Sequence, residues 1–331
     1  MIIKLKYKVL LIYLVFGLLI FLLTTFTVSP YLSDFQFKTL QQEIKTQLAH
    51  IDLALSTFMK NIQVNVEIIS GNNEVRTKND HFFTHFLNAD ERNFRYRTTE
   101  PELRIIKIFN SYRQAHPYIH SVYMGRENGS FVRSHPRARP TKYDPRVRPW
   151  YQLAKQNPGK MMMTAAYPSL TTRDINIGIV KALVDEKGKV YGVVGMDVTL
   201  KDLTRYMAHV KLMRNGYMML LDNKGVILVG ESSNESFQWV GNKIPLYKKI
   251  YSIDSGNLIF ERNRTGYYCF YYSSKILGWK ILSIVPVDDI HGEINRIILR
   301  FIVYCMLSLV LLSVVTLTGL HRYILNPIAR L

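Results

Sequence analysis

The stretch Tyr143–Ala154 reads YDPRVRPWYQLA, and its proline at position 149 marks the expected start of a short helix. Proline suits the first position of a helix, because its ring already holds a helical φ angle and the missing N–H would have no partner there. Asn157–Gly159 reads NPG, a sequence that ends helices. We therefore predict a helix over residues 149–156, with Arg148 just before its positive end and two aromatic residues directly behind it.

Short apolar runs that are typical of β-strands lie on both sides of this helix. Ser121–Met124 and Ser130–Val132 flank an Asn-Gly pair, which is a strong indication of a hairpin. Ile175–Val184 and Val190–Met196 flank the turn sequence DEKG. A threonine at position 199, with an acidic residue three positions on, then predicts the start of another helix.

The same order of elements returns in the C-terminal half of the chain as a shorter copy. A helical stretch over about 101–115 precedes the first set of strands. In the second copy, strands are expected at 217–221, 226–229, 258–261, 267–273 and 279–285. We therefore predict an α+β protein with two modules, each built on an antiparallel sheet.

A long helix is expected to carry both modules. Apolar residues recur in steps of three and four from Phe37 to Ile62, which is the stripe of an amphipathic helix. This helix would rise directly from Val9–Val28, an apolar run that contains no charged residue. Ile297–Leu320 is a second apolar run, and it contains one charged residue. About twenty apolar residues span a bilayer, so both runs are predicted transmembrane helices. The alternative for the first run is a cleaved signal peptide.

The charges beside the two apolar runs predict their orientation. Three lysines precede the first run, and His321, Arg322 and Arg330 follow the second. Positive flanks stay in the cytoplasm, so both termini are expected inside and residues 29–296 outside. This predicts a two-span protein of the inner (plasma) membrane with a periplasmic or extracellular domain.

The formal net charge of the chain is +18 at pH 7. The expected cytoplasmic ends are too short for a nucleic-acid-binding fold, so the topology argues against nucleic acid as a partner. A basic cluster spans Arg126–Arg148. It is either a solvated basic face or a region that attracts anionic ligands.

No pattern in the sequence predicts an enzyme, a cofactor or a metal site. Cys269 falls in the outer domain and Cys305 in the second apolar run, so no disulfide framework is expected. The nine histidines are scattered, and there is no metal-ligand spacing, phosphate-binding glycine loop or nucleophile motif. We therefore predict no catalytic residues, no metal ligands and no cofactor.

Four stretches of the outer domain resemble the double Cache (dCache) sensor domains of bacterial transmembrane receptors. They are RPWYQLA at 148–154, YGVVGMDVTL at 191–200, LLDNKGVIL at 220–228 and GWKILSIVP at 278–286. The resemblance implies a stalk helix that carries two PAS-like modules, with the ligand pocket in the membrane-distal one. The sequence HRYILNPIARL at 321–331 is similar to the opening of a HAMP signal-relay helix, which is longer, so we expect a truncation there.

These resemblances imply an order of segments along the chain. The expected segments are a cytoplasmic N-terminus (1–8), a transmembrane helix (9–28), an extracytoplasmic sensor domain (29–296), a second transmembrane helix (297–320) and the start of a HAMP domain (321–331). Within the sensor domain we expect a stalk helix (29–78), a membrane-distal module (79–210) and a membrane-proximal module (211–290). Ligand binding would be relayed to a cytoplasmic output, and dimerisation through the stalk would give a homodimer.

An amino-acid-sensing subgroup of the family implies a set of ligand-binding residues. The counterparts here are Tyr143, Arg148, Trp150, Tyr167 and Asp197, with Tyr151 beside the tryptophan. These residue types suit an L-amino acid, whose two charges must both be matched once water is excluded. Arg148 would hold the carboxylate through two parallel N–H bonds, Asp197 would face the ammonium, and the aromatic residues would wall the site.

One position departs from the subgroup. An acidic residue is expected two positions after the second tyrosine, and Ser169 stands there instead, with Asp174 nearby in sequence. Serine accepts a hydrogen bond from an ammonium but brings no charge. The departure leaves two alternatives open, namely another organic acid as the ligand and a Cache module that works through a partner protein without a small ligand.

Simpler interpretations of the single residues also stay open at this stage. Arg148 could be a solvated basic residue, as we expect for Arg146, and Asp197 could be a turn residue that follows its strand. The aromatic residues of the set could be ordinary core residues. Tyr123 and Phe131 are expected in the core rather than in the pocket.

Overall fold

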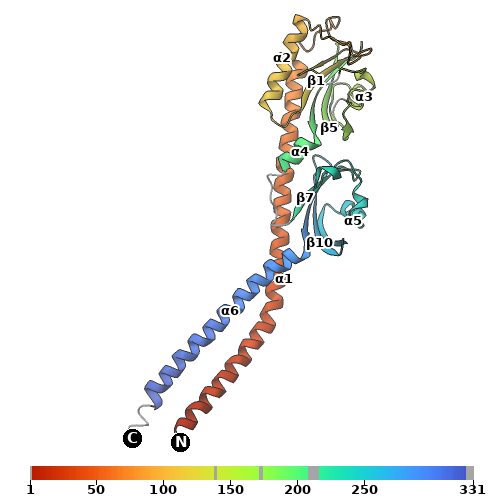
Figure 1. Ribbon diagram of the computed structural model, residues 1–331. Helices are drawn as coiled ribbons and strands as arrows, with labels where there is room; N and C mark the ends of the chain where they lie inside the picture. The colour runs from red at the N-terminus through yellow and green to blue at the C-terminus, as the bar shows by residue number, and fades with distance from the viewer. Residues whose placement is uncertain (1, 138–139, 171–173, 208–215, 326–331) are drawn as a thin grey trace.

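The computed structural model describes residues 2–137, 140–170, 174–207 and 216–325. Two sheet modules lie one after the other along a single long helix, α1 (Ile2–Gly71) (Figure 1). This helix runs without interruption from the first apolar run and ends at Gly71, a few residues before the expected end of the stalk helix at 78. The long helix and the two antiparallel sheets confirm the predicted α+β fold class.

A second long helix, α6 (Val287–Leu320), follows the second sheet and runs beside the N-terminal part of α1 (Figure 1). Gly17 of α1 lies against the side chain of Leu309 of α6. Both helices are long and apolar enough to cross a membrane. Phe26 is 81% exposed and Leu311 is 67% exposed, which suits side chains that face lipid.

The structure describes only part of the segment in which a HAMP helix is expected. Five residues, His321–Leu325, form a π-helical turn, η4, that continues α6. Residues 326–331, with the proline at 327 on which the resemblance rests, lie outside the described residues. The HAMP assignment therefore stays a prediction.

The first sheet has the strand order β2-β1-β6-β5-β3, and β4 also pairs with β5. All of these pairings are antiparallel. The sequence does not predict β3 and β4, because two or three residues are too few to show alternation. The strands are β1 (Ser121–Arg126), β2 (Phe131–Arg133), β3 (Met161–Met163), β4 (Tyr167–Pro168), β5 (Ile175–Val184) and β6 (Val190–Thr199).

The second sheet repeats this plan with the order β8-β7-β11-β10-β9, again antiparallel throughout. Its strands fall where the sequence predicts the shorter copy. They are β7 (Tyr217–Leu221), β8 (Ile227–Val229), β9 (Ser255–Arg262), β10 (Thr265–Ser273) and β11 (Lys280–Pro286). The helix α5 (Tyr247–Ser252) and two 3₁₀ turns, η2 (Ser233–Glu235) and η3 (Val240–Asn242), lie between β8 and β9.

Three further helices belong to the first module. The helix α2 (Glu100–Ala115) begins after Thr99, whose side chain accepts a hydrogen bond from the backbone N–H of Glu102. The helix α3 (Pro149–Gln156) has the predicted bounds and follows a 3₁₀ turn, η1 (Pro145–Val147). The helix α4 (Leu200–Met207) begins after Thr199, whose hydroxyl accepts from the N–H of Asp202, as the capping pattern predicts.

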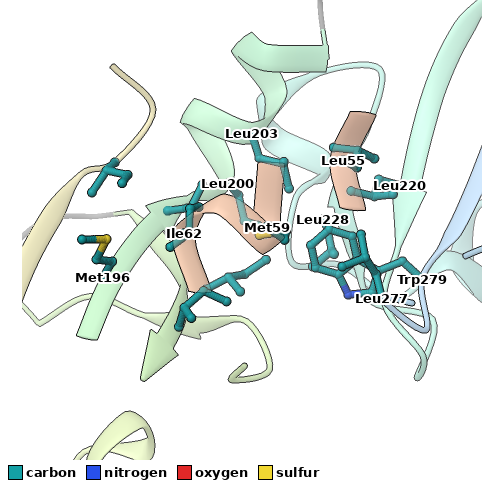
Figure 2. Close-up of a cluster of buried hydrophobic side chains, with 14 of the residues drawn as sticks. Leu55, Met59, Ile62, Met196, Leu200, Leu203, Leu220, Leu228, Leu277 and Trp279 are labelled. Atoms are coloured by element: carbon teal, nitrogen blue, oxygen red, sulfur yellow. The ribbon is translucent and has the colours of Figure 1, made fainter. Parts of the chain in front are cut away.

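The main hydrophobic core lies between α1 and one face of each sheet. From Ile44 to Ile69, α1 buries an apolar side chain every three or four residues, which confirms the predicted stripe. Full burial of each large aliphatic side chain contributes about 1.5–3 kcal/mol. Figure 2 shows where residues of both modules meet on α1, and it labels Leu55, Met59, Ile62, Met196, Leu200, Leu203, Leu220, Leu228, Leu277 and Trp279.

Candidate ligand-binding site

A pocket lies on the face of the first sheet that is turned away from α1. Strand alternation produces this face. In β6, Val194, Met196 and Val198 point into the core with α1, so the residues between them point the other way. Asp197 is one of these, and it lines the pocket.

Asp197 lies within β6, where it pairs with Ser121 of β1 and Gly178 of β5. The sequence predicts it after the end of the strand, so this detail of the prediction is wrong. Aspartate is depleted in strands, which is why the pattern suggests an earlier end. Gly178 makes the arrangement possible, because a Cβ atom there would lie 3.0 Å from the Tyr123 hydroxyl and 3.2 Å from Asp197 Oδ1.

The carboxylate of Asp197 is buried and fully engaged by neutral donors. The hydroxyls of Tyr123 and Tyr167 donate to Oδ1 at 2.6 and 2.9 Å, and Asn176 Nδ2 donates to Oδ2 at 3.0 Å. Burial raises the pKa of Asp197 to about 6, although these hydrogen bonds and the nearby charges of Arg133 and Arg148 oppose the shift. The group is ionised at neutral pH, and it holds a negative charge where water is scarce.

Arg148 lies at the N-terminus of α3, as the proline at position 149 predicts. Its Nη2 atom donates to the carbonyl of Pro168 at 2.9 Å, and its guanidinium carbon lies 5.8 Å from the centre of the Tyr167 ring. The side chain is partly exposed and lines the pocket. Tyr167 therefore contacts both charged residues, with its hydroxyl on Asp197 and its ring beside Arg148.

The sequence suggests that Arg146 is a solvated residue, but the structure places it in an ion pair. Its Nε and Nη2 atoms donate to the two carboxylate oxygens of Asp144 at 2.9 and 2.8 Å. The pair lowers the pKa of the Asp144 carboxyl. Both side chains of the pair remain partly exposed, and neither lines the pocket. The structure thus separates the two arginines of the RVR sequence into one in an ion pair and one in the pocket.

Six of the seven residues that the sequence singles out meet around this pocket. They are Tyr143, Arg148, Trp150, Tyr167, Ser169 and Asp197. Trp150 lies close to β1 because Gly125 has no side chain there, and a Cβ atom at that position would be 2.8 Å from the indole. Asp174, the acid near Ser169, accepts from the Ser169 backbone N–H at 2.9 Å through its own carbonyl and lies outside the pocket lining.

Tyr151 is not among the residues that line the pocket, so its predicted part in ligand binding stays a prediction. It is 1% exposed and its ring lies 5.6 Å from that of Trp150. Burial raises the pKa of its phenol to about 12, and the nearby carboxylate of Glu127 adds to this shift. Tyr151 is a core residue that fixes α3 against the sheet.

The sequence misses seven residues of the pocket lining. They are Ser121, Tyr123, Phe131, Arg133, Arg137, Leu170 and Asn176. Tyr123 and Phe131 are buried, as expected of core residues, but they also form pocket walls. Strand alternation could have placed Tyr123 on the face of Asp197, whereas Arg137 lies in a loop whose path no local pattern shows.

Comparisons with known proteins support the resemblance. The family described as Cache domain (dCache_1) matches residues 36–294. A probable methyl-accepting chemotaxis protein of Bacillus thuringiensis is 26% identical over 261 residues, and the methyl-accepting chemotaxis protein McpB of Bacillus subtilis is 26% identical over 223. These matches cover 77% and 67% of this chain, but only 38% and 32% of the relatives.

Solved structures of chemoreceptor ligand-binding domains share the fold. The domain of Pseudomonas fluorescens CtaA in complex with L-alanine has a TM-score of 0.58 at 19% identity, covering 76% of this chain and 98% of that one. Pseudomonas aeruginosa PctB with L-Arg has a TM-score of 0.59 at 18% identity, covering 78% and 92%. Campylobacter jejuni Tlp3 with isoleucine has a TM-score of 0.57 at 18% identity, covering 79% and 98%. At these identities the likeness shows the fold alone.

Proposed function

Because the chain belongs to the Cache domain family, we propose that its pocket binds a small carboxylate-bearing ligand, with L-amino acids as the first candidates. The matching domain is a sensor domain of chemoreceptors, which is not an enzyme, and the relatives above are methyl-accepting chemotaxis proteins. The observation that carries the proposal is the presence of Arg148 and the buried Asp197 in one aromatic-lined pocket. Arg148 binds the carboxylate of the ligand, and Asp197 binds the ammonium.

Two features of the pocket and one comparison support an amino acid. Asp197 stays ionised at neutral pH inside a buried site, where an unpaired charge is costly and a ligand ammonium supplies a partner. The rings of Tyr143, Trp150 and Tyr167 give the site faces that attract a cation. CtaA, PctB and Tlp3 have been solved with amino acids bound, and these proteins share the fold.

A carboxylate without an amino group is the second candidate, and Ser169 favours it. The amino-acid subgroup has an acidic residue at this position, whereas the pocket here is lined by a neutral hydroxyl. Only one described carboxylate of the lining is then left to neutralise an ammonium. A screen must therefore contain organic acids as well as amino acids.

The signalling path that we propose follows the two long helices. The apolar parts of α1 and α6 cross the plasma membrane with both termini in the cytoplasm and the two sheet modules outside. The first module is then membrane-distal and the second membrane-proximal. Binding favours one of two conformations, and the change passes through α6 to a HAMP helix and a cytoplasmic output, with the chain working as a homodimer.

Thermal unfolding of the full chain in lipid nanodiscs tests the ligand class. The panel contains the L-amino acids and a set of mono- and dicarboxylic acids at millimolar concentration. A ligand present at a hundred times its Kd stabilises the folded state by about 2.7 kcal/mol, which corresponds to a rise of several degrees in Tm. An L-amino acid that produces such a rise supports the proposal. A complete panel without any rise contradicts it.

A further inference from the structure

The described part of the pocket lining carries more positive charge than an ordinary amino acid needs. Three guanidinium groups line it, those of Arg133, Arg137 and Arg148, against the single carboxylate of Asp197. An L-amino acid with a neutral side chain is a zwitterion, so it adds no net charge to the site. Two of the three positive charges would then remain without a counterpart among the described residues.

Arg137 is the most informative of the three. Its side chain is 4% exposed, and its guanidinium carbon lies 4.3 Å from the centre of the Tyr143 ring and 5.0 Å from that of Phe86. Its Nη1 atom donates to the carbonyl of Thr141 at 3.0 Å. Its Nη2 atom is buried and has no hydrogen-bond partner among the described residues. Buried polar groups nearly always have a partner, so a missing one at a pocket wall indicates that a ligand supplies it.

Arg133 adds a second charge on the same side of the sheet. It belongs to β2 and pairs with Tyr123, the residue that donates to Asp197. The pKa of Arg137 is lowered by burial, and the positive charges of Arg133 and Arg148 lower it further. The three cations therefore repel one another across the pocket. An anionic group among them would relieve this repulsion as well as the loss of hydration.

We propose that the ligand is an L-amino acid with an acidic side chain, of the aspartate and glutamate class, whose second carboxylate is bound by Arg137 with Arg133 beside it. This inference rests on the proposed function, in which Arg148 binds the α-carboxylate and Asp197 binds the ammonium. Arg137 supplies the specificity. The neutral serine at position 169 is consistent with an acidic ligand, since a second acid there would repel the side-chain carboxylate of the ligand.

Calorimetric titration of the full chain in nanodiscs tests the inference with matched pairs of ligands. L-glutamate and L-glutamine have nearly the same shape, as have L-aspartate and L-asparagine, and each pair differs by one negative charge. Hydrogen bonds to charged groups correspond to about tenfold to hundredfold in affinity. We expect at least one acid to bind at least tenfold more tightly than its amide.

Variants test whether Arg137 causes the preference for the acid over its amide. In Arg137→Gln, the ratio of the Kd for the amide to the Kd for the acid should fall from at least ten towards one. Arg133→Gln should lower the same ratio by a smaller factor, and it serves as the second probe if Arg137→Gln does not fold. Arg104→Gln is the matched control, because Arg104 is an exposed residue of α2 that pairs with Glu74.

The outcomes separate this inference from the proposed function. Amides or other neutral amino acids that bind as tightly as the acids would overturn the acidic-ligand inference and leave the proposed function in place. Binding of organic acids but of no amino acid would also overturn the acidic-ligand inference alone, and binding of neither class would overturn both. A ratio that stays at ten or more in both arginine variants would overturn the assignment of the second carboxylate to these residues.

Discussion

The two sheets share one plan, yet they carry opposite chemistry at the same position. In the first sheet the central strand β6 places Asp197 between Ser121, the first residue of β1, and Gly178 of β5. In the second sheet the central strand β11 places Ile284 between Tyr217, the first residue of β7, and Cys269 of β10. A buried carboxylate in one sheet thus corresponds to a buried isoleucine in the other.

The surroundings of the two positions also differ, being polar and charged around Asp197 and apolar around Ile284. Asp197 is held by two tyrosine hydroxyls and an amide in a pocket with three arginines. Ile284 and Cys269 are each 0% exposed in a cluster of apolar side chains that fills the corresponding face of the second sheet. The topology therefore provides a place for a ligand in both modules, and a few side chains decide which of them has a pocket.

Placing a carboxylate in the second sheet should have the largest effect. Ile284→Asp buries a charge without the donors that Asp197 has, and an uncompensated buried charge costs about 3–5 kcal/mol. For a domain of this size we expect Tm to fall by roughly 6–20 °C. Thermal unfolding of the full chain measures this change.

The matched control for this variant is Ile284→Val, which removes one methyl group and should cost only about 0.5–1.5 kcal/mol. Equal losses of stability in the two variants would show that the shape of the site, and not its charge, distinguishes the two sheets.

Removing the charge of Asp197 should abolish tight binding. Asp197→Asn keeps the size of the side chain but leaves the ligand ammonium without its counterion, so affinity should fall by about tenfold to hundredfold. Calorimetry with the L-amino acid that stabilises the chain most measures the loss, and Ile284→Val should bind that ligand like the wild type. Unchanged affinity in Asp197→Asn would mean that the two sheets do not differ in the proposed way.

The raised pKa of Asp197 predicts how binding depends on pH. Burial lifts this pKa to about 6, above the ordinary value near 3.8. An ammonium is bound by the ionised form, which is fully present above about pH 7 and is lost as the pH falls through 6. Affinity should therefore be about tenfold lower at pH 5 than on the plateau. The stability of the unliganded chain should show the opposite trend, because protonation of Asp197 removes a desolvated charge and stabilises the folded state as the pH falls from 6 towards 4.

Titrations between pH 7.5 and 5 check the pH dependence of binding. The tyrosines and arginines that act on Asp197 are Tyr123, Tyr143, Tyr167, Arg133 and Arg148, which do not titrate in this range. The backbone N–H of His120 donates to the Asp197 carbonyl, and burial lowers the pKa of this histidine below its ordinary value. Burial also lowers the pKa of His135, in the same module, to about 3, so that histidine stays neutral throughout. Asp197→Asn should lose the pH slope. A slope of the same size in that variant would assign the titration to another group.

The two arginines of the RVR sequence give the finest comparison. Arg148→Gln should weaken binding about tenfold, because the carboxylate of the ligand loses its charged partner. Arg146→Gln should leave affinity within about a factor of two, because Arg146 is paired with Asp144 outside the pocket. Parallel titrations measure both variants. Equal losses in the two variants would contradict the assignment of Arg148 as the carboxylate partner.

Much of the fold could be predicted because it follows from local patterns. The three- and four-residue steps between Phe37 and Ile62 identify α1, and the proline at position 149 with the NPG sequence at 157–159 gives the bounds of α3. The strands β3 and β4 escaped prediction, because only pairing with β5 makes them strands. The end of β6 was predicted too early, because three hydrogen bonds stabilise an aspartate that strand propensity disfavours.

The candidate site was predictable only as far as sequence patterns reach. Arg148, Trp150 and Asp197 are part of recognisable sequences, and the structure brings them to one pocket. Arg133 and Arg137 belong to no such sequence. They reach the pocket because the chain after β1 returns along β2 and continues past Tyr143. Charge alone could not have distinguished them from the other members of the basic cluster.

The most direct test of the account compares the preferred L-amino acid with two derivatives of it. One is the α-methyl ester, which lacks the negative charge that we propose Arg148 binds, and the other is the deaminated acid, which lacks the positive charge that we propose Asp197 binds. Calorimetry on the wild-type chain at pH 7.5 gives the three affinities. The account predicts that each derivative binds at least tenfold more weakly than the parent amino acid. A derivative that binds as tightly as the parent would contradict it.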